Sequence, residues 1–344
     1  MDPLLATYIA VALIFFLMAT GVPVFAALAL SGAAGLIMVE DLAFLMTRLK
    51  SLTYSTTAVY TLVIIPLFIL MGAFAHHAKI GEKLFHVAAK WVGHLPGGLA
   101  MASILTSAGF AATSGSSVAT AATVGSVALP EMKKAGYDPS LSAGAVAAGG
   151  VLGVLIPPSV LLIFYAALTE SSAGKMLIAG IVPGLLTTFI FMMGIWLIAR
   201  KGASRTAVTQ RAGWGEAVAG TGQAWQVLVL FIVVMGGIYM GLMTPTEAGA
   251  LGAFAAFLML LAHRASWREG MLGKITESFK STIDTTVMIL FTVIGAGVFS
   301  YFLPLVQVPN QVASAVVESG LPPYLVIACL LLVFVPLGMF LDAF

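Results

Sequence analysis

The stretch Ser114-Gly-Ser-Ser117 lies near the middle of LPGGLAMASILTSAGFAATSGSSVATAATVGSVALP, a run of 36 residues from Leu95 to Pro130 without a charged side chain. One membrane-spanning helix needs only about 20 apolar residues. The run is too long for one crossing, and its central glycine and hydroxyl residues interrupt a single helix. Backbone exposed at membrane depth is tolerated only where it is buried in protein or lines a cavity. We therefore predict a re-entrant hairpin over residues 97–130, with two half-helices and a polar tip.

The composition places the rest of the chain in a lipid bilayer. Hydrophobic residues make up 60% of the 344 residues and charged residues 9%, and the mean hydropathy is +1.06. Soluble domains carry roughly 25% charged residues, so we expect an all-α polytopic membrane protein without a soluble domain. The net charge of +2 is small and says nothing about nucleic acid, and no nucleic-acid partner is expected. Asp2 stands where a signal peptide has basic residues, so the apolar start predicts a retained helix.

Apolar segments predict further membrane helices along the chain. They lie at about 4–19, 21–39, 58–76, 139–169, 176–199, 224–242, 246–262, 282–304 and from 322 onward. Residues 51–57 and 81–92 are expected to lie at the membrane interface. If the hairpin is re-entrant, thirteen Lys and Arg residues share one face, and only Arg48, Lys50 and Lys175 lie on the other. A full crossing at 97–130 gives at best eleven against five, so the positive-inside rule favours the re-entrant hairpin, a cytoplasmic Lys-rich face and a periplasmic N-terminus.

Two parts of the chain resemble each other at a shift of about 222–226 residues. Pro23 aligns with Pro245, the segment 95–99 aligns with 321–325, and Ser116 aligns with Asp342. The two parts start on opposite faces in the predicted topology. Inverted repeats of this kind are typical of secondary transporters, which bind ions and substrate at the repeat interface. The repeat also predicts that the chain ends inside a second hairpin and that a complete protein would carry roughly 80 more residues.

The hairpin tip, Ser114, Gly115, Ser116 and Ser117, is the first candidate site. The second half-helix would present free N–H groups and a positive dipole end at the tip. The first half-helix would present free carbonyl groups there. Together with the hydroxyls, these groups suit a carboxylate or a dehydrated Na⁺ ion. Close helix packing is the alternative, because small residues are common at membrane helix interfaces.

Two further candidates contain unusual residues at membrane depth. Pro157 and Pro158, followed by Ser159, lie in the middle of the 139–169 span, remove two donors and break the helix. The freed carbonyls could bind an ion if the break faces the hairpin tip, and a simple kink is the alternative. Gly338 and Asp342 end the chain's last apolar stretch. A buried acid costs about 2.5–3.5 kcal/mol and is usually functional, although Asp342 could instead be an interfacial acid at a chain end.

Two other groups of polar residues favour a structural interpretation. Thr244, Pro245 and Glu247 have the spacing of a capping box at the start of a helix. Four histidines lie near the Lys-rich edge with no spacing typical of a metal site, and solvation at the interface is the expected explanation. These are His76, His77, His86 and His94.

The ordered motifs resemble those of one membrane-protein family. Leu-Pro-Gly-Gly, Ser-Gly-Ser-Ser-Val-Ala-Thr, Met-Lys-Lys-Ala-Gly-Tyr-Asp, Gly-Val-Leu-Ile-Pro-Pro-Ser, Met-Thr-Pro-Thr-Glu-Ala and Gly-Met-Phe-Leu-Asp follow each other between residues 95 and 342. The resemblance, which extends from Gly21 to Asp342, is to the DctM-type large membrane subunit of TRAP (tripartite ATP-independent periplasmic) transporters. The departure is at the C-terminus, because the family continues through a second hairpin and a second broken helix.

The resemblance implies a Na⁺-coupled importer of organic acids such as C4-dicarboxylates, 2-oxo acids or sialic acids, without a cofactor. It also implies a bacterial inner-membrane location, a small four-helix membrane partner and a periplasmic binding protein. An elevator-type movement is expected, with Ser116 and Asp342 as the Na⁺ candidates. The organisation would then be 1–57 scaffold, 58–199 first repeat core, 200–223 cytoplasmic loop, 224–281 second scaffold and 282–344 a truncated second core.

Three other functions remain to be weighed. A stand-alone Na⁺- or H⁺-coupled carboxylate transporter would have the same architecture but no binding protein. An intramembrane hydrolase using Ser116 or Ser117 would need a base within about 2.6–3.2 Å of the hydroxyl, and all five histidines are expected near the cytoplasmic edge. A channel would need rings of charges or carbonyls from an oligomer, whereas an inverted repeat favours alternating access.

Overall fold

The computed structural model describes residues 3–202, 213–268 and 270–340, and every regular element in those ranges is a helix. This confirms the all-helical membrane class. By length and composition, five helices in the described ranges can cross a membrane, or six if one bent pair counts as a span. The chain divides into two compact units, Met1–Val59 with Thr285–Phe344 and Tyr60–Asp284. The two units are described separately.

The first unit is built around the end of one long helix. It contains α1 (Pro3–Ala19), α2 (Val24–Val39), α3 (Leu42–Thr57), residues 285–305 of α17 (Met271–Leu305), α18 (Val308–Glu318) and α19 (Pro323–Phe340). A cluster of buried apolar side chains, including Leu36, Leu45 and Phe302, joins α2, α3 and α17. A Cβ atom at Gly32 of α2 would lie 2.7 Å from the Cα of Phe299 in α17. The missing side chain therefore lets the two backbones approach closely.

The second unit contains the predicted hairpin and the predicted broken helix. α6 and α7 form the hairpin, and α8 and α9 form the broken helix, which bends by 44°. The helices are η1 (Tyr60–Val63), α4 (Ile64–His77), α5 (Ile80–Val92), α6 (Gly98–Ser114), α7 (Ser117–Lys134), α8 (Pro139–Leu155), α9 (Val160–Leu168), α10 (Ala173–Ala179), α11 (Ile181–Arg200), α12 (Trp214–Thr221), η2 (Gly222–Ala224), α13 (Trp225–Phe231), the π-helix η3 (Ile232–Gly236), α14 (Gly237–Tyr239), α15 (Pro245–Ala262), α16 (Arg264–Arg268) and residues 271–284 of α17.

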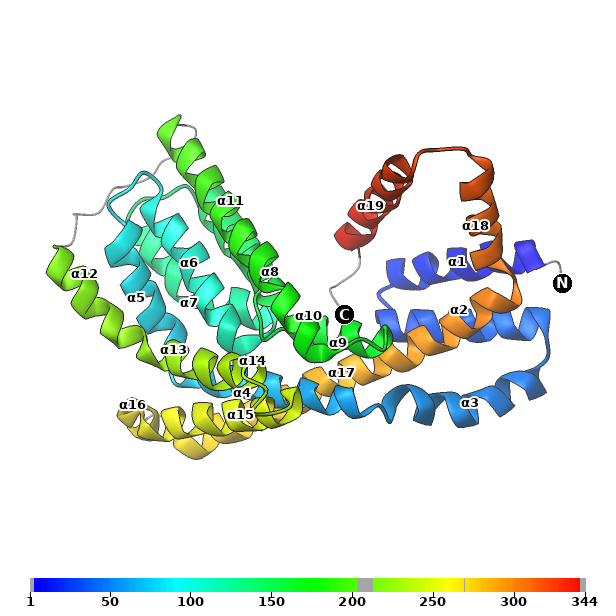
Figure 1. The fold of residues 1–344 in the computed structure, drawn as a ribbon, viewed down its shortest axis with the longest axis horizontal. Helices are drawn as coiled ribbons and strands as arrows, with labels where there is room; N and C mark the ends of the chain where they lie inside the picture. The colour runs from blue at the N-terminus through cyan, green and yellow to red at the C-terminus, as the bar shows by residue number, and fades with distance from the viewer. Residues whose placement is uncertain (1–2, 203–212, 269, 341–344) are drawn as a thin grey trace. The chain divides into compact units, whose positions relative to one another are not determined.

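The first arm of the hairpin forms the centre of this unit. Fourteen of the 17 residues of α6 are buried, and α4, α5, α7, α8 and α11 contact it (Figure 1). A helix that is apolar on all sides is stable when neighbours cover all of its faces. The N–H of Leu99 donates to the Tyr137 hydroxyl at 3.1 Å, which ties the start of α6 to the loop after α7. Burial raises the pKa of Tyr137, so the phenol stays neutral.

The helix that begins at Pro245 starts as its sequence predicts. The Thr244 N–H donates to Glu247 Oε2 at 2.7 Å, and the Glu247 N–H donates to Thr244 Oγ1 at 3.3 Å. These reciprocal bonds satisfy two donors that a helix start leaves without an intrahelical partner. The structural interpretation of this motif is confirmed.

Helix ends differ from the predicted spans where polar residues continue a helix. The predicted span 282–304 lies inside α17, which begins eleven residues earlier, at Met271. The interfacial segment 51–57 is the last part of α3, which begins at Leu42. An apolar stretch of sequence predicts which part of a helix can lie in lipid. It does not predict the residue at which the helix begins or ends. The domain boundaries at 57/58 and 281/282 stay predictions.

The close contact between α2 and α17 leads to a test of packing. Gly32→Ala should destabilise the protein by about 1–3 kcal/mol, because the added methyl group meets backbone atoms that cannot rotate away. Gly194→Ala, in α11, is the control, since its added Cβ would have no neighbour within 4 Å. Thermal unfolding in detergent should show a lower Tm for Gly32→Ala only. Equal Tm values for both variants would contradict the close approach.

Candidate functional site

The hairpin tip reverses the chain within two residues. Gly115 ends α6 in the left-handed conformation, with φ at +62°, and its N–H donates to the Ala111 carbonyl at 3.1 Å. Glycine takes this conformation without a steric penalty, which makes it the usual residue at a helix C-terminus. Ser116 is extended and caps α7, accepting a hydrogen bond from the Ala119 N–H at 3.4 Å. Only Gly115 and Ser116 therefore separate the end of the first half-helix from the start of the second.

The second break follows from the two prolines. α8 ends at Leu155, and Pro157 and Pro158 cannot donate the hydrogen bonds that would continue it. Ser159 caps α9, accepting from the Leu162 N–H at 3.3 Å and donating to the Val154 carbonyl at 2.5 Å. One hydroxyl thus bridges the end of one half-helix and the start of the next.

The two breaks contact each other directly. The Val160 N–H donates to the Gly115 carbonyl at 3.1 Å. A Cβ atom at Gly115 would lie only 2.6 Å from the Pro158 carbonyl oxygen, so the left-handed glycine also provides the space for this contact. Gly153 of α8 packs against the Ser116 carbonyl. The structure therefore brings Ser114–Ser117 and Pro157–Ser159 into one site.

Both N-terminal and C-terminal helix ends meet at this site. α7 and α9 begin there and present positive dipole ends, while α6 and α8 end there and present carbonyl groups. Ser114 and Ser159 are buried, whereas Ser116 and Ser117 are partly exposed. Among the described residues, no group of three or more His, Cys, Asp or Glu side chains could hold a metal ion. The two breaks offer carbonyl and hydroxyl oxygens to a cation.

The described structure does not test the candidates Gly338 and Asp342. Gly338 lies in α19 of the first unit, and a Cβ atom added to it would have no neighbour within 4 Å. Asp342 lies outside the described residues. Their role stays a prediction from the repeat.

Two residues that sequence reasoning missed support the tip. Thr120 Oγ1 lies 2.8 Å from Ser114 Oγ, so this hydroxyl pair connects the two arms of the hairpin. A Cβ atom at Gly72 of α4 would lie 2.7 Å from the Cα of Ser114. The signal for Thr120 is its position four residues after Ser116, one helical turn along the same face. Gly72 has no comparable signal, because its partner lies 42 residues away in the sequence.

One histidine makes a contact between helices. His76 is exposed, in agreement with the expected solvation, and its Nδ1 atom also lies 2.8 Å from Thr123 Oγ1. The hydrogen bond joins the end of α4 to the hairpin arm α7. Sequence spacing could not reveal it, because the two residues belong to different helices.

Comparison with known proteins finds one family along nearly the whole chain. The family described as "Tripartite ATP-independent periplasmic transporter, DctM component" matches residues 11–344. The chain is 39% identical over 316 residues to the C4-dicarboxylate TRAP transporter large permease protein DctM of Pseudomonas aeruginosa, covering 92% of this chain and 72% of that protein. It is 32% identical over 355 residues to the DctM protein of Vibrio cholerae, covering 97% and 78%. The sialic acid TRAP transporter large permease protein SiaM of Vibrio cholerae is 30% identical over 285 residues, covering 83% and 65%.

The contact between Gly153 and the tip can be tested within one helix. Gly153→Ala should lower stability by about 1–3 kcal/mol, because the new methyl group meets the Ser116 carbonyl and lies 2.7 Å from Thr120 Oγ1. Gly144→Ala, also in α8, has no neighbour within 4 Å and should be neutral or stabilising by about 0.5–1 kcal/mol. The Tm values of the two variants, measured by thermal unfolding, are compared. A Gly153→Ala variant as stable as Gly144→Ala would show that α8 does not pack on the tip.

Proposed function

The chain belongs to the DctM family of TRAP transporter large permease subunits, and from this premise we propose that it imports organic acids by coupling their movement to a Na⁺ gradient. Membership makes it a multi-pass transporter permease and not an enzyme. A tripartite transporter implies two partners, a small membrane subunit and a periplasmic binding protein. The observation that carries the proposal is the joined pair of helix breaks, with the Val160 N–H on the Gly115 carbonyl.

The proposed substrate is an organic acid with at least one carboxylate. The names of similar proteins specify C4-dicarboxylates and sialic acid. Two helices, α7 and α9, begin at the joined breaks, and helix N-termini favour anions through their free N–H groups and dipoles. The partly exposed hydroxyls of Ser116 and Ser117 add donors that can reach a carboxylate. The proposed substrate position is therefore beside the hairpin tip.

Sodium is the proposed coupling ion. Broken transporter helices coordinate Na⁺ with carbonyl oxygens from unwound backbone and from half-helix C-termini. The end of α8 supplies carbonyl oxygens of this kind, and the Ser116 hydroxyl adds a further oxygen. Pro157 and Pro158 prevent the backbone at the break from forming a helix. Asp342 is the proposed counterpart of Ser116 in the second repeat. Because Na⁺ and carboxylate have opposite charges, binding of one at adjacent positions favours binding of the other.

The proposed direction of transport is from the periplasm to the cytoplasm across the bacterial inner membrane. The distribution of Lys and Arg supports a periplasmic N-terminus and a cytoplasmic Lys-rich face. In the proposed elevator movement, hairpin and broken helix move as one body, which the hydrogen bond and glycine contacts between them support. Substrate would come from the binding protein, and the small subunit would support the scaffold.

Ion coupling is testable without knowledge of the substrate. The Tm of the complete transporter, purified with its small subunit, should be higher in NaCl than in choline chloride at equal ionic strength. A ligand that binds only the folded state stabilises it by about 2.7 kcal/mol at 100 times its Kd. The rise should saturate with Na⁺, and Ser116→Ala and Asp342→Ala should each reduce it. Ser140→Ala, at the exposed start of α8, is the control that should keep the full rise.

For each variant, the quantity compared is the difference between its Tm in NaCl and its Tm in choline chloride. This is necessary because loss of the Ser116 cap alone lowers stability by about 0.5–2 kcal/mol. An identical Tm in both salts would contradict Na⁺ binding. It would leave proton coupling as the better explanation of an energised carrier.

Uptake by proteoliposomes tests the partners. Labelled succinate should accumulate only with an inward Na⁺ gradient and with the binding protein present outside. Accumulation of equal rate without the binding protein would contradict the tripartite mechanism and indicate a stand-alone carrier. Accumulation driven by a proton gradient alone would replace Na⁺ with H⁺ as the coupling ion.

A further inference from the structure

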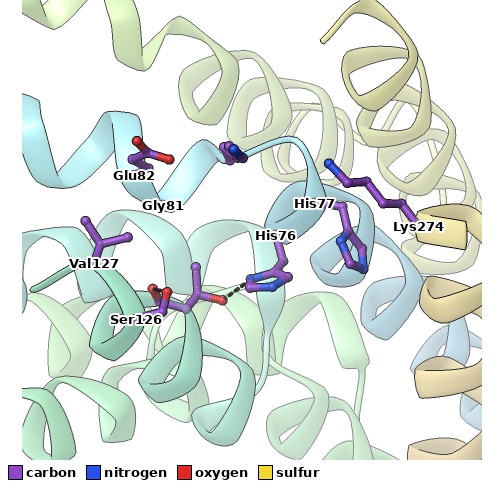
Figure 2. A pocket seen from close by; sticks show the side chains of 9 residues that line it. His76, His77, Gly81, Glu82, Ser126, Val127 and Lys274 are labelled. Atoms are coloured by element: carbon purple, nitrogen blue, oxygen red, sulfur yellow. Dashed lines mark hydrogen bonds between the residues drawn. The ribbon is translucent and has the colours of Figure 1, made fainter. Parts of the chain in front are cut away.

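A second polar site lies away from the hairpin tip, in a cavity of about 230 Å³ (Figure 2). We call it the basic cavity and define it by His76, His77, Lys79 and Lys274, which line it. The end of α4, the start of α5, one face of α7 and the start of α17 form its walls. All four elements belong to the second unit. The cavity is therefore a feature of one compact part of the chain.

The charges of the basic cavity favour an anion. Lys79, in the turn between α4 and α5, and Lys274, in α17, contribute two ammonium groups, and two imidazole rings lie beside them. Glu82 is the acidic residue among the lining side chains, so the lining holds more lysines than carboxylates. Glu277 Oε2 lies 3.8 Å from His77 Nε2, and its side chain is 72% exposed. The lining is thus positive with neutral histidines and becomes more so when they are protonated.

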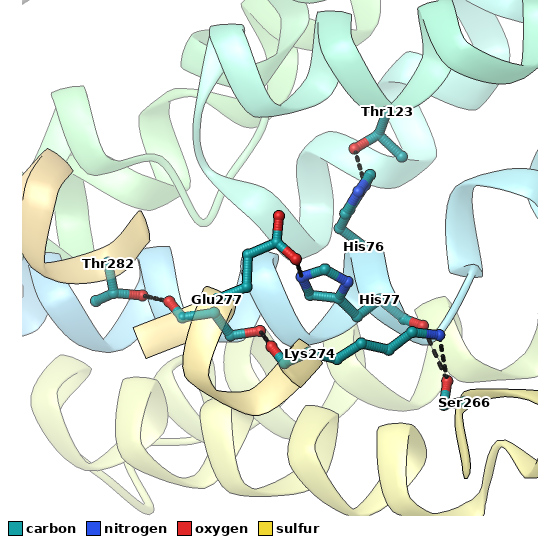
Figure 3. A network of polar contacts seen from close by, with 8 residues as sticks. His76, His77, Thr123, Ser266, Lys274, Glu277 and Thr282 are labelled. Carbon is teal, nitrogen blue, oxygen red and sulfur yellow. Dashed lines mark hydrogen bonds and ion pairs between the residues drawn. The ribbon is translucent and has the colours of Figure 1, made fainter. Parts of the chain in front are cut away.

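Hydrogen bonds hold these groups in place (Figure 3). His76 Nδ1 lies 2.8 Å from Thr123 Oγ1, and Lys274 Nζ donates to Ser266 Oγ at 3.1 Å. Ser266 Oγ donates in turn to the His77 carbonyl at 3.4 Å. Four helices, α4, α7, α16 and α17, are therefore linked around the cavity. Groups positioned before binding lose less conformational entropy when a ligand arrives.

Backbone donors add to the positive potential. Gly81 and Glu82 lie in the first turn of α5 and line the cavity. The residue before this helix, Lys79, makes no side-chain capping bond to it. First-turn N–H groups have no partner within their own helix, and they carry the positive end of its dipole. They can therefore donate to an oxygen of an anion that the lysines attract.

The size and lining of the cavity select the class of anion. Ligand pockets for drug-sized molecules measure about 300–1,000 Å³, so 230 Å³ suits a smaller ligand. Val127 is the lining residue with an aliphatic side chain, and Ser126 and Thr123 add hydroxyls. Such a surface offers little to a lipid acyl chain and much to a small hydrophilic anion. Two lysines from separate segments of the chain suit a ligand with two carboxylates.

We propose that the basic cavity binds a small dicarboxylate independently of Na⁺, as a second site for transported acid on the Lys-rich side of the protein. The inference rests on the proposed transport of organic acids. α7 connects the two sites, because Ser116 begins it and Ser126 lies ten residues later. At 1.5 Å per residue, the sites are about 15 Å apart along the helix. The cavity receives the acid after it leaves the hairpin tip.

Succinate binding to the complete transporter in Na⁺-free choline buffer tests the proposal. A saturable rise in Tm is expected with succinate and not with acetate at equal ionic strength. Lys274→Gln should weaken the apparent affinity about tenfold or more, because a charge-assisted hydrogen bond to the anion is lost. Lys274→Arg keeps the charge and should retain most of the affinity. Lys280→Gln is the matched control, since this exposed lysine lies on the same helix outside the cavity.

One further variant guards against misfolding. Lys79→Gln should weaken Na⁺-free succinate binding as Lys274→Gln does, which provides a second variant if one of them unfolds. No saturable effect of succinate would overturn the proposal. So would equal losses in Lys274→Gln and Lys280→Gln, or saturable binding of inorganic phosphate but not of succinate. Loss of Na⁺-driven uptake with this binding intact would count only against the proposed transport mechanism.

Discussion

The structure of the second unit depends on satisfying backbone polar groups where two helices are interrupted inside an apolar chain. In lipid, each unpaired N–H or carbonyl costs several kcal/mol. The breaks at Gly115 and at Pro157–Ser159 satisfy each other, because the Val160 N–H donates to the Gly115 carbonyl and serine caps both following helices. Neither break would be stable alone in hydrocarbon. Their pairing leaves the remaining carbonyls and hydroxyls available for a ligand.

This pairing requires helices to approach more closely than side chains normally allow. Gly72 lies against the Ser114 backbone, and Gly153 lies against the Ser116 carbonyl. Dispersion between closely packed backbones replaces the hydrophobic effect, which does not drive association inside a bilayer. The same glycines therefore stabilise the unit and position the tip. Stability and the geometry of the tip are set by the same contacts.

The hairpin arm α7 links two sites of different character. At its start, dipole ends and carbonyls surround uncharged serines. Two turns further on, Thr123 bonds to His76 at the wall of a cavity lined by Lys79 and Lys274. Charged side chains thus lie at the edge of the apolar segment, where burying a charge is less of a penalty. The partial charges of helix ends and hydroxyl groups lie in its interior.

The sequence by itself determined the class of protein, the hairpin, the position of both breaks and the capping box at Thr244. These features follow from local rules, since charge is excluded from lipid, proline ends helices, and glycine and serine begin or end them. Only the tertiary structure decided that Gly115 meets Val160, that Gly72 supports Ser114 and that His76 bonds to Thr123. Such contacts join helices that are distant in the sequence, and they depend on crossing angles and close approach. No spacing or composition along the chain encodes those directly.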